Sequence, residues 1–159
     1  MRPPAEFRND TASAAEIARH LWLCDADYMP RLSSRVSIDA YAAKLAKRAT
    51  LFEAWVEDEL VGLVAAYCDL SQRTAFITNV SVAAAHRACG IASRLLATFL
   101  TRAQELKLQR VELEVNPGNH SAATLYTRHG FVSASAEDPA RLVMCLSDDT
   151  SPPIIYVKQ

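Results

Sequence analysis

A short turn between a strand-like and a helix-like segment carries the residue types that could bind a phosphate. Residues 87–93 read RACGIAS and place one of the chain's four glycines at position 90. The first N–H groups of a helix have no intrahelical acceptors, and with the positive end of the helix dipole they attract anions. Gly90 admits a ligand to the backbone, and Arg87 adds positive charge. The pattern Arg87-x-x-Gly90-x-Ala92 therefore predicts a diphosphate site, although a plain connecting turn would have the same composition.

Regular elements on both sides must hold this turn in place. Residues 73–82, RTAFITNVSV, have the composition of a strand, and apolar residues from Ile91 to Leu106 recur at helical spacing. Near the N-terminus, Ser13 and Glu16 form the S-x-x-E pattern of a capping box, which predicts a helix that ends near Leu23. The other expected elements are strands at 6–8, 51–57, 60–70, 110–115, 131–135 and 140–147, and helices at 37–49 and from Asn119 or Ser121 to His129.

The order of these elements, β-α-α-β-β-β-α-β-α-β-β, limits the fold. Three consecutive strands joined by short polar turns predict an antiparallel meander, and the interleaved helices must cover it. We therefore expect an α/β (α+β) fold with a mixed, mostly antiparallel sheet and helices on both faces. Residues 1–147 are expected to form a single domain, followed by a proline-containing tail at 148–159.

Composition excludes several classes of function. The chain has 159 residues, and its 17 basic and 18 acidic side chains nearly cancel, which argues against a general nucleic-acid or anionic-membrane binder. Its four cysteines are widely spaced without a CxxC pair, so we expect reduced thiols and no metal site. No stretch has the length of a membrane-spanning helix, which favours a cytoplasmic protein.

A second segment identifies the family that the chain resembles. Residues 116–131 read NPGNHSAATLYTRHGF. Together with Arg87-x-x-Gly90-x-Ala92, this segment resembles the GNAT N-acetyltransferase superfamily, whose acetyl-coenzyme-A-binding pattern is Arg/Gln-x-x-Gly-x-Gly/Ala. The positions that match the second family segment are Asn119, Ala122, Leu125, Tyr126, Gly130 and Phe131.

The resemblance covers almost the whole chain, with three departures. Ala84 stands where a proline is common, Ala88 replaces a frequent glycine, and Asn79 occupies a strand position where many members carry an acidic residue. The first two concern loop rigidity. The third leaves the identity of the catalytic base open.

The resemblance implies a binding mode for acetyl-CoA as co-substrate. The backbone of Val80 and Val82 would bind the pantetheine arm, and Asn119 would contact it. Tyr126 would lie beside the sulfur, where its phenol is a candidate acid for the departing thiolate, or it simply packs against Phe131. The positions implied to bind the cofactor are Val80, Val82, Arg87, Ala88, Cys89, Gly90, Ile91, Ala92, Ser93, Asn119, Ala122 and Tyr126.

An acceptor amine must lose a proton to attack a thioester. Glu112 and Glu114 lie on one face of the strand at 110–115 and are candidate bases, although each is also typical of a solvated strand residue. Asn79 holding a water is a third candidate. Cys89 invites a nucleophile hypothesis, but no histidine is paired with it in sequence, so a space-filling role is favoured.

These observations predict an N-acetyltransferase that moves an acetyl group from acetyl-CoA to a primary amine of a small molecule or peptide, by direct attack in a ternary complex. A non-catalytic acyl-CoA-binding or sensory module on the same fold is the alternative, and a purely structural turn is a third. The resemblance also suggests a homodimer, with the tail as one candidate contact. Four acidic residues would favour a cationic acceptor: Asp25, Asp27, Glu53 and Glu57.

Overall fold

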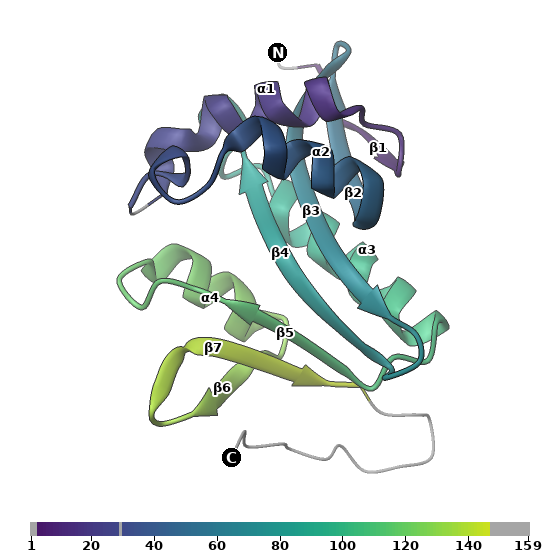
Figure 1. Cartoon of the computed structure of the whole chain (residues 1–159), viewed down its shortest axis with the longest axis vertical. Coiled ribbons are helices and arrows are strands. Elements are labelled where there is room, and N and C mark those ends of the chain that lie inside the picture. Colours follow the sequence, from purple (N-terminus) through teal and green to yellow (C-terminus); the bar gives the residue numbers. More distant parts are fainter. Residues whose placement is uncertain (1–2, 29, 147–159) are drawn as a thin grey trace. The chain divides into compact units, whose positions relative to one another are not determined.

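The computed structural model of the chain describes residues 3–28 and 30–146 (Figure 1). Its strands are β1 (Glu6–Asn9), β2 (Thr50–Val56), β3 (Glu59–Asp69), β4 (Thr74–Val82), β5 (Arg110–Glu114), β6 (Val132–Ser135) and β7 (Asp138–Cys145). Its α-helices are α1 (Ala14–Cys24), α2 (Ile38–Arg48), α3 (Ile91–Glu105) and α4 (His120–Arg128). Short 3-10 helices follow at η1 (Asp25–Asp27), η2 (Leu32–Ser34) and η3 (Ala84–His86). The predicted order of strands and helices is confirmed.

The strands form a seven-stranded sheet in the order β1-β2-β3-β4-β5-β7-β6. β4 and β5 are parallel, whereas β1 with β2, β2 with β3, β5 with β7 and β6 with β7 are antiparallel. A parallel pair needs a crossover connection, and α3 supplies it between β4 and β5. The predicted fold class, an α/β (α+β) fold with a mixed and mostly antiparallel sheet, is therefore confirmed.

The chain divides into two compact units, and the first holds the predicted diphosphate turn. This unit contains Met1–Ala66 and Asn79–Leu96. Within it, α1 and α2 lie in front of the strands and the first turns of α3 lie behind them (Figure 1). Ile17 and Leu21 on α1 and Leu45 on α2 are fully buried, because their spacing places them on the sheet-facing side of each helix. The apolar faces of these helices thus close the core of this unit.

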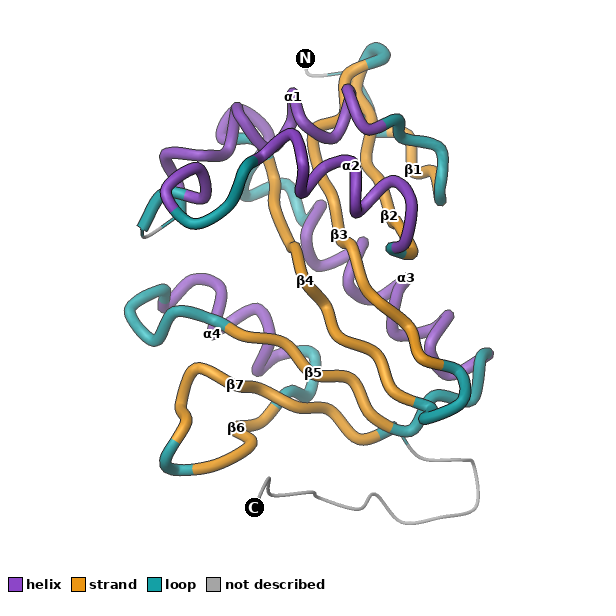
Figure 2. Tube along the Cα trace, in the orientation of Figure 1, coloured by secondary structure: helices purple, strands orange, loops and turns teal. Residues whose placement is uncertain are grey.

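The described part of the second unit comprises Tyr67–Thr78 and residues 97–146. Here β5, β7 and β6 form one ladder, which Figure 2 draws together with α4. A Cβ at Gly130, just past α4, would lie 3.1 Å from Cε of Met144 on β7, so the end of the helix rests against that strand. The single domain at 1–147 stays a prediction. The predicted tail at 148–159 lies outside the described residues.

The helix starts follow their predicted caps. The Ser13 side chain accepts a hydrogen bond from the Glu16 N–H, and the Glu16 side chain accepts one from the Ser13 N–H, which completes the capping box. Asn119, one of the two candidates for capping α4, accepts the hydrogen bond from Ala122. The 3-10 turns η1 and η2 lie between α1 and α2. Within residues 3–28 and 30–146, no helix is long and apolar enough to cross a membrane.

Candidate functional site

The predicted diphosphate turn joins the end of β4 to the start of α3. Ala88 and Gly90 both adopt left-handed backbone angles, with φ of 61° and 76°. The first helical hydrogen bond of α3 runs from the Arg94 N–H to the Gly90 carbonyl, 3.0 Å away. The N–H groups of Ile91 and Ala92 precede this bond, in the first turn, where a helix supplies no acceptor of its own. A Cβ at Gly90 would meet no atom within 4 Å, so its backbone lies open for a ligand.

A glycine on β3 brings the start of α3 onto the sheet. A Cβ at Gly62 would lie 2.7 Å from Cγ2 of Ile91 and 3.3 Å from Cδ1 of Leu95. Because nothing larger than hydrogen fits there, the first turn of α3 packs directly on the strand. Gly62 thus fixes where the N-terminus of α3, and with it the turn, is placed.

A cavity of about 350 Å³ opens beside the turn. Cys89, Gly90 and Ile91 line one part of it, and Phe7 and Arg94 line another. The Arg94 guanidinium lies 4.0 Å from the Phe7 ring centroid, which is a cation–π contact. The turn therefore borders a concave surface with a cation at its side.

β4 extends past its pairing with β5. The described ladder pairs Thr74–Ile77 with Arg110–Leu113, and β4 then continues to Val82. The backbone of Val80 and Val82 therefore lies beyond the last pair on that edge. The binding of a pantetheine arm by Val80 and Val82 stays a prediction.

The Arg87 side chain is held by protein groups. Its guanidinium forms an ion pair with Asp27 of η1, and its Nε donates to the Val82 carbonyl at 3.2 Å. The sequence predicted that Arg87 would add charge to the diphosphate site. In the structure, Arg87 connects the turn to η1 through its ion pair with Asp27, a contact that no sequence pattern indicated. Its role toward a diphosphate stays a prediction.

A chain of polar side chains links His20 of α1, through Ser81 and Asn79 of β4, to Tyr28 just after η1. Nε2 of His20 lies 2.8 Å from Oγ of Ser81, Ser81 donates to Oδ1 of Asn79 at 2.7 Å, and Nδ2 of Asn79 donates to Oη of Tyr28 at 2.8 Å. A serine hydroxyl has one hydrogen, and Ser81 gives it to Asn79, so His20 is the donor to Ser81. Asn79 is therefore engaged at both ends of its amide.

Burial keeps this chain uncharged near neutral pH. His20 is 1% exposed, and burial lowers the pKa of its imidazole from 6.5 to about 4. Burial also raises the pKa of the Tyr28 phenol, against a hydrogen bond from Asn79 that lowers it. Neighbouring Cys24 is buried as well, and its pKa is raised to about 11. None of these groups is therefore an ionised base at neutral pH.

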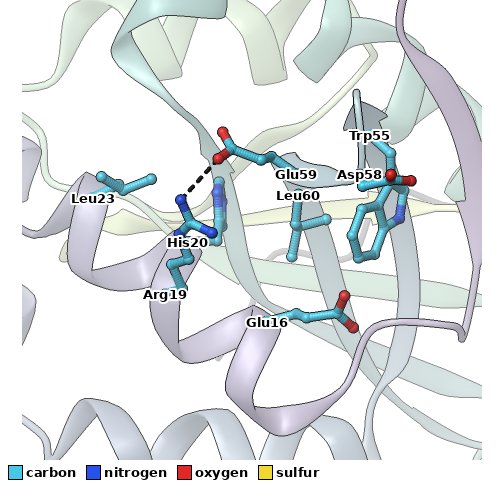
Figure 3. A pocket seen from close by; sticks show the side chains of 8 residues that line it. All are labelled: Glu16, Arg19, His20, Leu23, Trp55, Asp58, Glu59 and Leu60. Atoms are coloured by element: carbon cyan, nitrogen blue, oxygen red, sulfur yellow. Dashed lines mark hydrogen bonds and ion pairs between the residues drawn. The ribbon is translucent and has the colours of Figure 1, made fainter.

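His20 also lines a smaller cavity of about 100 Å³ between α1 and the β2–β3 hairpin (Figure 3). Glu16 and Arg19 reach it from α1, and Arg19 is paired there with Glu59 of β3 at 2.7 Å. Nδ1 of His20 is buried, and it makes no hydrogen bond of normal geometry with a described residue.

Three of the four acids expected to favour a cationic acceptor have internal partners. Asp25 accepts hydrogen bonds from the Ser33 N–H and hydroxyl, both at 2.7 Å, and these bonds lower the pKa of Asp25. Asp27 is paired with Arg87. Glu53 is fully buried and accepts from the N–H groups of Thr11 and Ala12 and from the Trp55 indole. These acids are committed to structure, so they give no support to a cationic acceptor.

The second unit places the two predicted glutamates in an ion-pair cluster. Glu112 is paired with Arg110 and, at 2.9 Å, with Arg141. Arg141 also binds Glu114 at 2.9 Å and lies 5.7 Å from the Phe76 ring centroid. Before Glu112 accepts a proton it must give up an ion pair, because both of its oxygens are bound to guanidinium groups. Its role as a base stays a prediction that this geometry does not favour.

Other predicted residues of this unit lie on α4. Tyr126 is 7% exposed, and its ring packs edge-on against Phe131 with centroids 5.9 Å apart. Oδ1 of Asn119 caps the helix, and Ala122 donates to it at 3.1 Å. The roles of Asn119, Ala122 and Tyr126 toward acetyl-CoA stay predictions.

Sequence reasoning missed His20 and Ser81, and it did not foresee that Asp27 pairs with Arg87. The alternation of β4 contained one signal, because Asn79 and Ser81 are polar residues on the side of the strand that becomes buried. His20 and Asp27 gave no comparable signal, since their partners are about 60 residues away in sequence. Within 3–28 and 30–146, no cluster of three or more His, Cys, Asp or Glu side chains is arranged to hold a metal ion.

The mixed sheet, the open turn after β4 and the N-terminus of α3 form an α/β arrangement of the kind that can bind a phosphate. A model of the acetyltransferase (GNAT) family matches residues 14–131. The chain therefore belongs to the GNAT acetyltransferase family, and the resemblance noted in its sequence is confirmed.

Known proteins add three comparisons. L-2,4-diaminobutyric acid acetyltransferase of Methylotuvimicrobium alcaliphilum is 34% identical over 79 residues, 48% of this chain and 45% of that protein. A GNAT-family acetyltransferase from Staphylococcus aureus Mu50 superposes with a TM-score of 0.74 at 12% identity, over 91% of this chain and all of that one. A Bacillus subtilis acetyltransferase in complex with CoA superposes with a TM-score of 0.67 at 19% identity, over 91% of this chain and all of that one. The two structures support the fold. The sequence match spans about half of the curated relative.

Proposed function

We propose that this protein transfers an acetyl group from acetyl-CoA to a primary amine of a small molecule or peptide, by direct attack in a ternary complex. The observation that carries the proposal is the open turn at Gly90, where backbone donors at the start of α3 have no acceptor within the helix. Membership of the acetyltransferase family and the CoA complex of the Bacillus subtilis neighbour support acetyl-CoA as the donor.

The residues of the first unit fit a coenzyme. N–H groups from Arg87 to Ser93 would bind the diphosphate, and the edge of β4 at Val80 and Val82, beyond its ladder with β5, would pair with the amide groups of the pantetheine arm. Arg94 beside the neighbouring cavity adds a positive charge for an anionic ligand. The protein's contribution is thus to align the thioester and to offer donors to its carbonyl.

The attacking amine must reach the thioester as the free base. Asn79 carries no ionisable group, and His20 is a weak base because of its lowered pKa. Glu112 and Glu114, the two other candidate bases, are each paired with arginine. Proton release to water is therefore the route that this structure favours. Tyr126 stays the candidate acid for the departing thiolate. We expect the rate to rise with pH as the amine itself loses its proton.

The alternative is a non-catalytic acyl-CoA-binding module. Its specific support is that Asn79 stands at the usual acidic position and that its amide is engaged with Ser81 and Tyr28. Both versions bind the coenzyme, but only the enzyme releases free CoA when an amine is added.

Ligand-induced stabilisation tests the turn. Thermal unfolding is measured with acetyl-CoA and with an analogue that lacks the diphosphate, for the wild type, for Gly90→Leu and for Ala85→Leu as a control in exposed η3. A ligand at 100 times its Kd adds about 2.7 kcal/mol. We expect this increment in the wild type and in the control only. An increment that survives in Gly90→Leu means that the turn is not the site.

Turnover separates the enzyme from the module. Release of the CoA thiol is followed with a panel of primary amines, and Tyr126→Phe is compared with the wild type. We expect amine-dependent release that is slower in the variant. If acetyl-CoA binds and no amine in the panel is acetylated, the non-catalytic alternative is favoured.

A further inference from the structure

Arg35 lies beside Tyr28 without a carboxylate partner. Its guanidinium carbon is 5.9 Å from the Tyr28 ring centroid, and its backbone N–H caps η2 by donating to the Leu32 carbonyl at 3.0 Å. The side chain is exposed, and none of the ion pairs found among the described residues includes it. The aromatic ring therefore orients a guanidinium whose hydrogen-bond donors remain available.

Tyr28 is held against the strand that is proposed to bind the thioester. Its hydroxyl accepts the hydrogen bond from Asn79, and Asn79 immediately precedes Val80 on β4. Ser81 and His20 fix the other end of the Asn79 amide. Arg35 is thus linked to β4 through one ring and one amide, and both of these are buried or half-buried.

The segment between α1 and α2, residues 25–37, carries an excess of positive charge when Arg87, the partner of Asp27, is counted with it. Asp27 is paired with Arg87, and Asp25, which accepts hydrogen bonds from Ser33, is the single remaining negative charge against Arg31 and Arg35, so one positive charge is in excess. Arg31 and Arg35 have no ion-pair partner among the described residues. A ligand that docks here gains from carrying an anionic group.

We propose that Arg35 binds a carboxylate of the acceptor, so that the substrate is an amino-acid-like amine and not a plain diamine; this inference rests on the proposed function. A guanidinium presents two parallel N–H donors that match the two oxygens of a carboxylate. One guanidinium oriented on the Tyr28 ring carries one charge, which a single carboxylate balances. Arg35 is then the specificity-determining residue, and Tyr28 positions it.

The effect of the acceptor's carboxylate on KM is measured by comparing pairs of acceptor amines. L-2,4-diaminobutyrate is compared with 1,3-diaminopropane, and L-lysine with cadaverine, because the members of each pair differ only in the carboxylate. We expect the wild type to have a KM at least tenfold lower for the carboxylate-bearing member of the pair that it acetylates. Phosphoethanolamine is the comparison for another anion. A preference for it over the carboxylates would overturn the proposal.

Variants assign the effect to Arg35. Arg35→Gln should raise the KM of the carboxylate-bearing acceptor 10- to 100-fold, with less than a twofold change for the matched diamine and little change in kcat. Arg35→Lys should recover part of the loss, and Arg31→Gln serves as the control for general charge. An equal loss for both acceptors, or the same loss in Arg31→Gln, would show that Arg35 does not bind the carboxylate.

Two variants of Tyr28 test its positioning role. Tyr28→Phe keeps the ring under Arg35, so the preference for the carboxylate should persist within about twofold. Tyr28→Leu removes the ring, and its KM for the carboxylate-bearing acceptor should rise as it does in Arg35→Gln. If both variants keep the preference, the ring does not position Arg35.

The outcomes also separate this inference from the proposed function. Failure of acetyl-CoA to bind would remove the proposed function itself. Binding of acetyl-CoA together with acetylation of diamines alone would leave the proposed function intact and overturn the carboxylate site. Binding without acetylation of any carboxylate-bearing amine would also overturn it.

Discussion

Acid should destabilise this protein through one buried histidine. The pKa of His20 is lowered by burial from 6.5 to about 4, so the unfolded chain binds a proton more readily than the folded one. The stability that His20 contributes is complete above pH 6.5 and is lost as the pH falls toward 4. At 1.36 kcal/mol per pH unit, this loss approaches about 3 kcal/mol. His20 is 1% exposed, so solvent screens little of the effect.

Chemical denaturation between pH 7.5 and pH 4 measures this loss. The wild type is compared with His20→Asn, which retains an N–H donor for Ser81 but does not titrate. We expect the free energy of unfolding of the wild type to fall by about 3 kcal/mol more than that of the variant over this range. Parallel pH profiles for the two proteins would refute the assignment of a buried, neutral imidazole to His20.

Three further predictions concern a strained backbone position, a tightly packed glycine and a buried carboxylate. Ala88 has a positive φ, so Ala88→Gly should stabilise the protein by about 0.5–1 kcal/mol, whereas Ala85→Gly should not; the midpoint of urea unfolding measures both. Gly62→Ala forces a Cβ to 2.7 Å from Ile91, so we expect a loss of about 1–3 kcal/mol in the same assay and weaker acetyl-CoA binding by calorimetry. Glu53→Ala leaves several buried donors without an acceptor and should cost about 3–5 kcal/mol, whereas Glu53→Gln should cost less; equal losses would contradict this reading of its hydrogen bonds.

Local signals predicted most of the fold. The capping box of Ser13 and Glu16, the alternation at 110–115 and the helical spacing after Ile91 each depend on neighbours within a few residues. For the same reason the turn at Gly90 could be located, since its left-handed backbone and the helix that follows are both local features. The tight packing at Gly62 could not be predicted, because it depends on a helix far along the chain.

Sequence patterns could not predict which side chains surround the site residues. Glu112 looked like a candidate base, but the pairing of β5 with β7 places Arg141 beside it. Asp27 looked available for a cationic ligand, but the fold gives it Arg87 as a partner. Opposite charges attract wherever the register of strands and loops brings them together, and that register is a property of the whole sheet.

The sequence by itself determined the family, the order of strands and helices and the place of the turn at Gly90, because periodicity, caps and short motifs depend on covalent neighbours. Only the tertiary structure decided which side chains stay available for chemistry. It joined His20, Ser81, Asn79 and Tyr28 into one uncharged chain and left Arg35 without an acidic partner. The physical reason is that burial and hydrogen-bond partners depend on distance in space, and residues distant in sequence meet only after the sheet has formed.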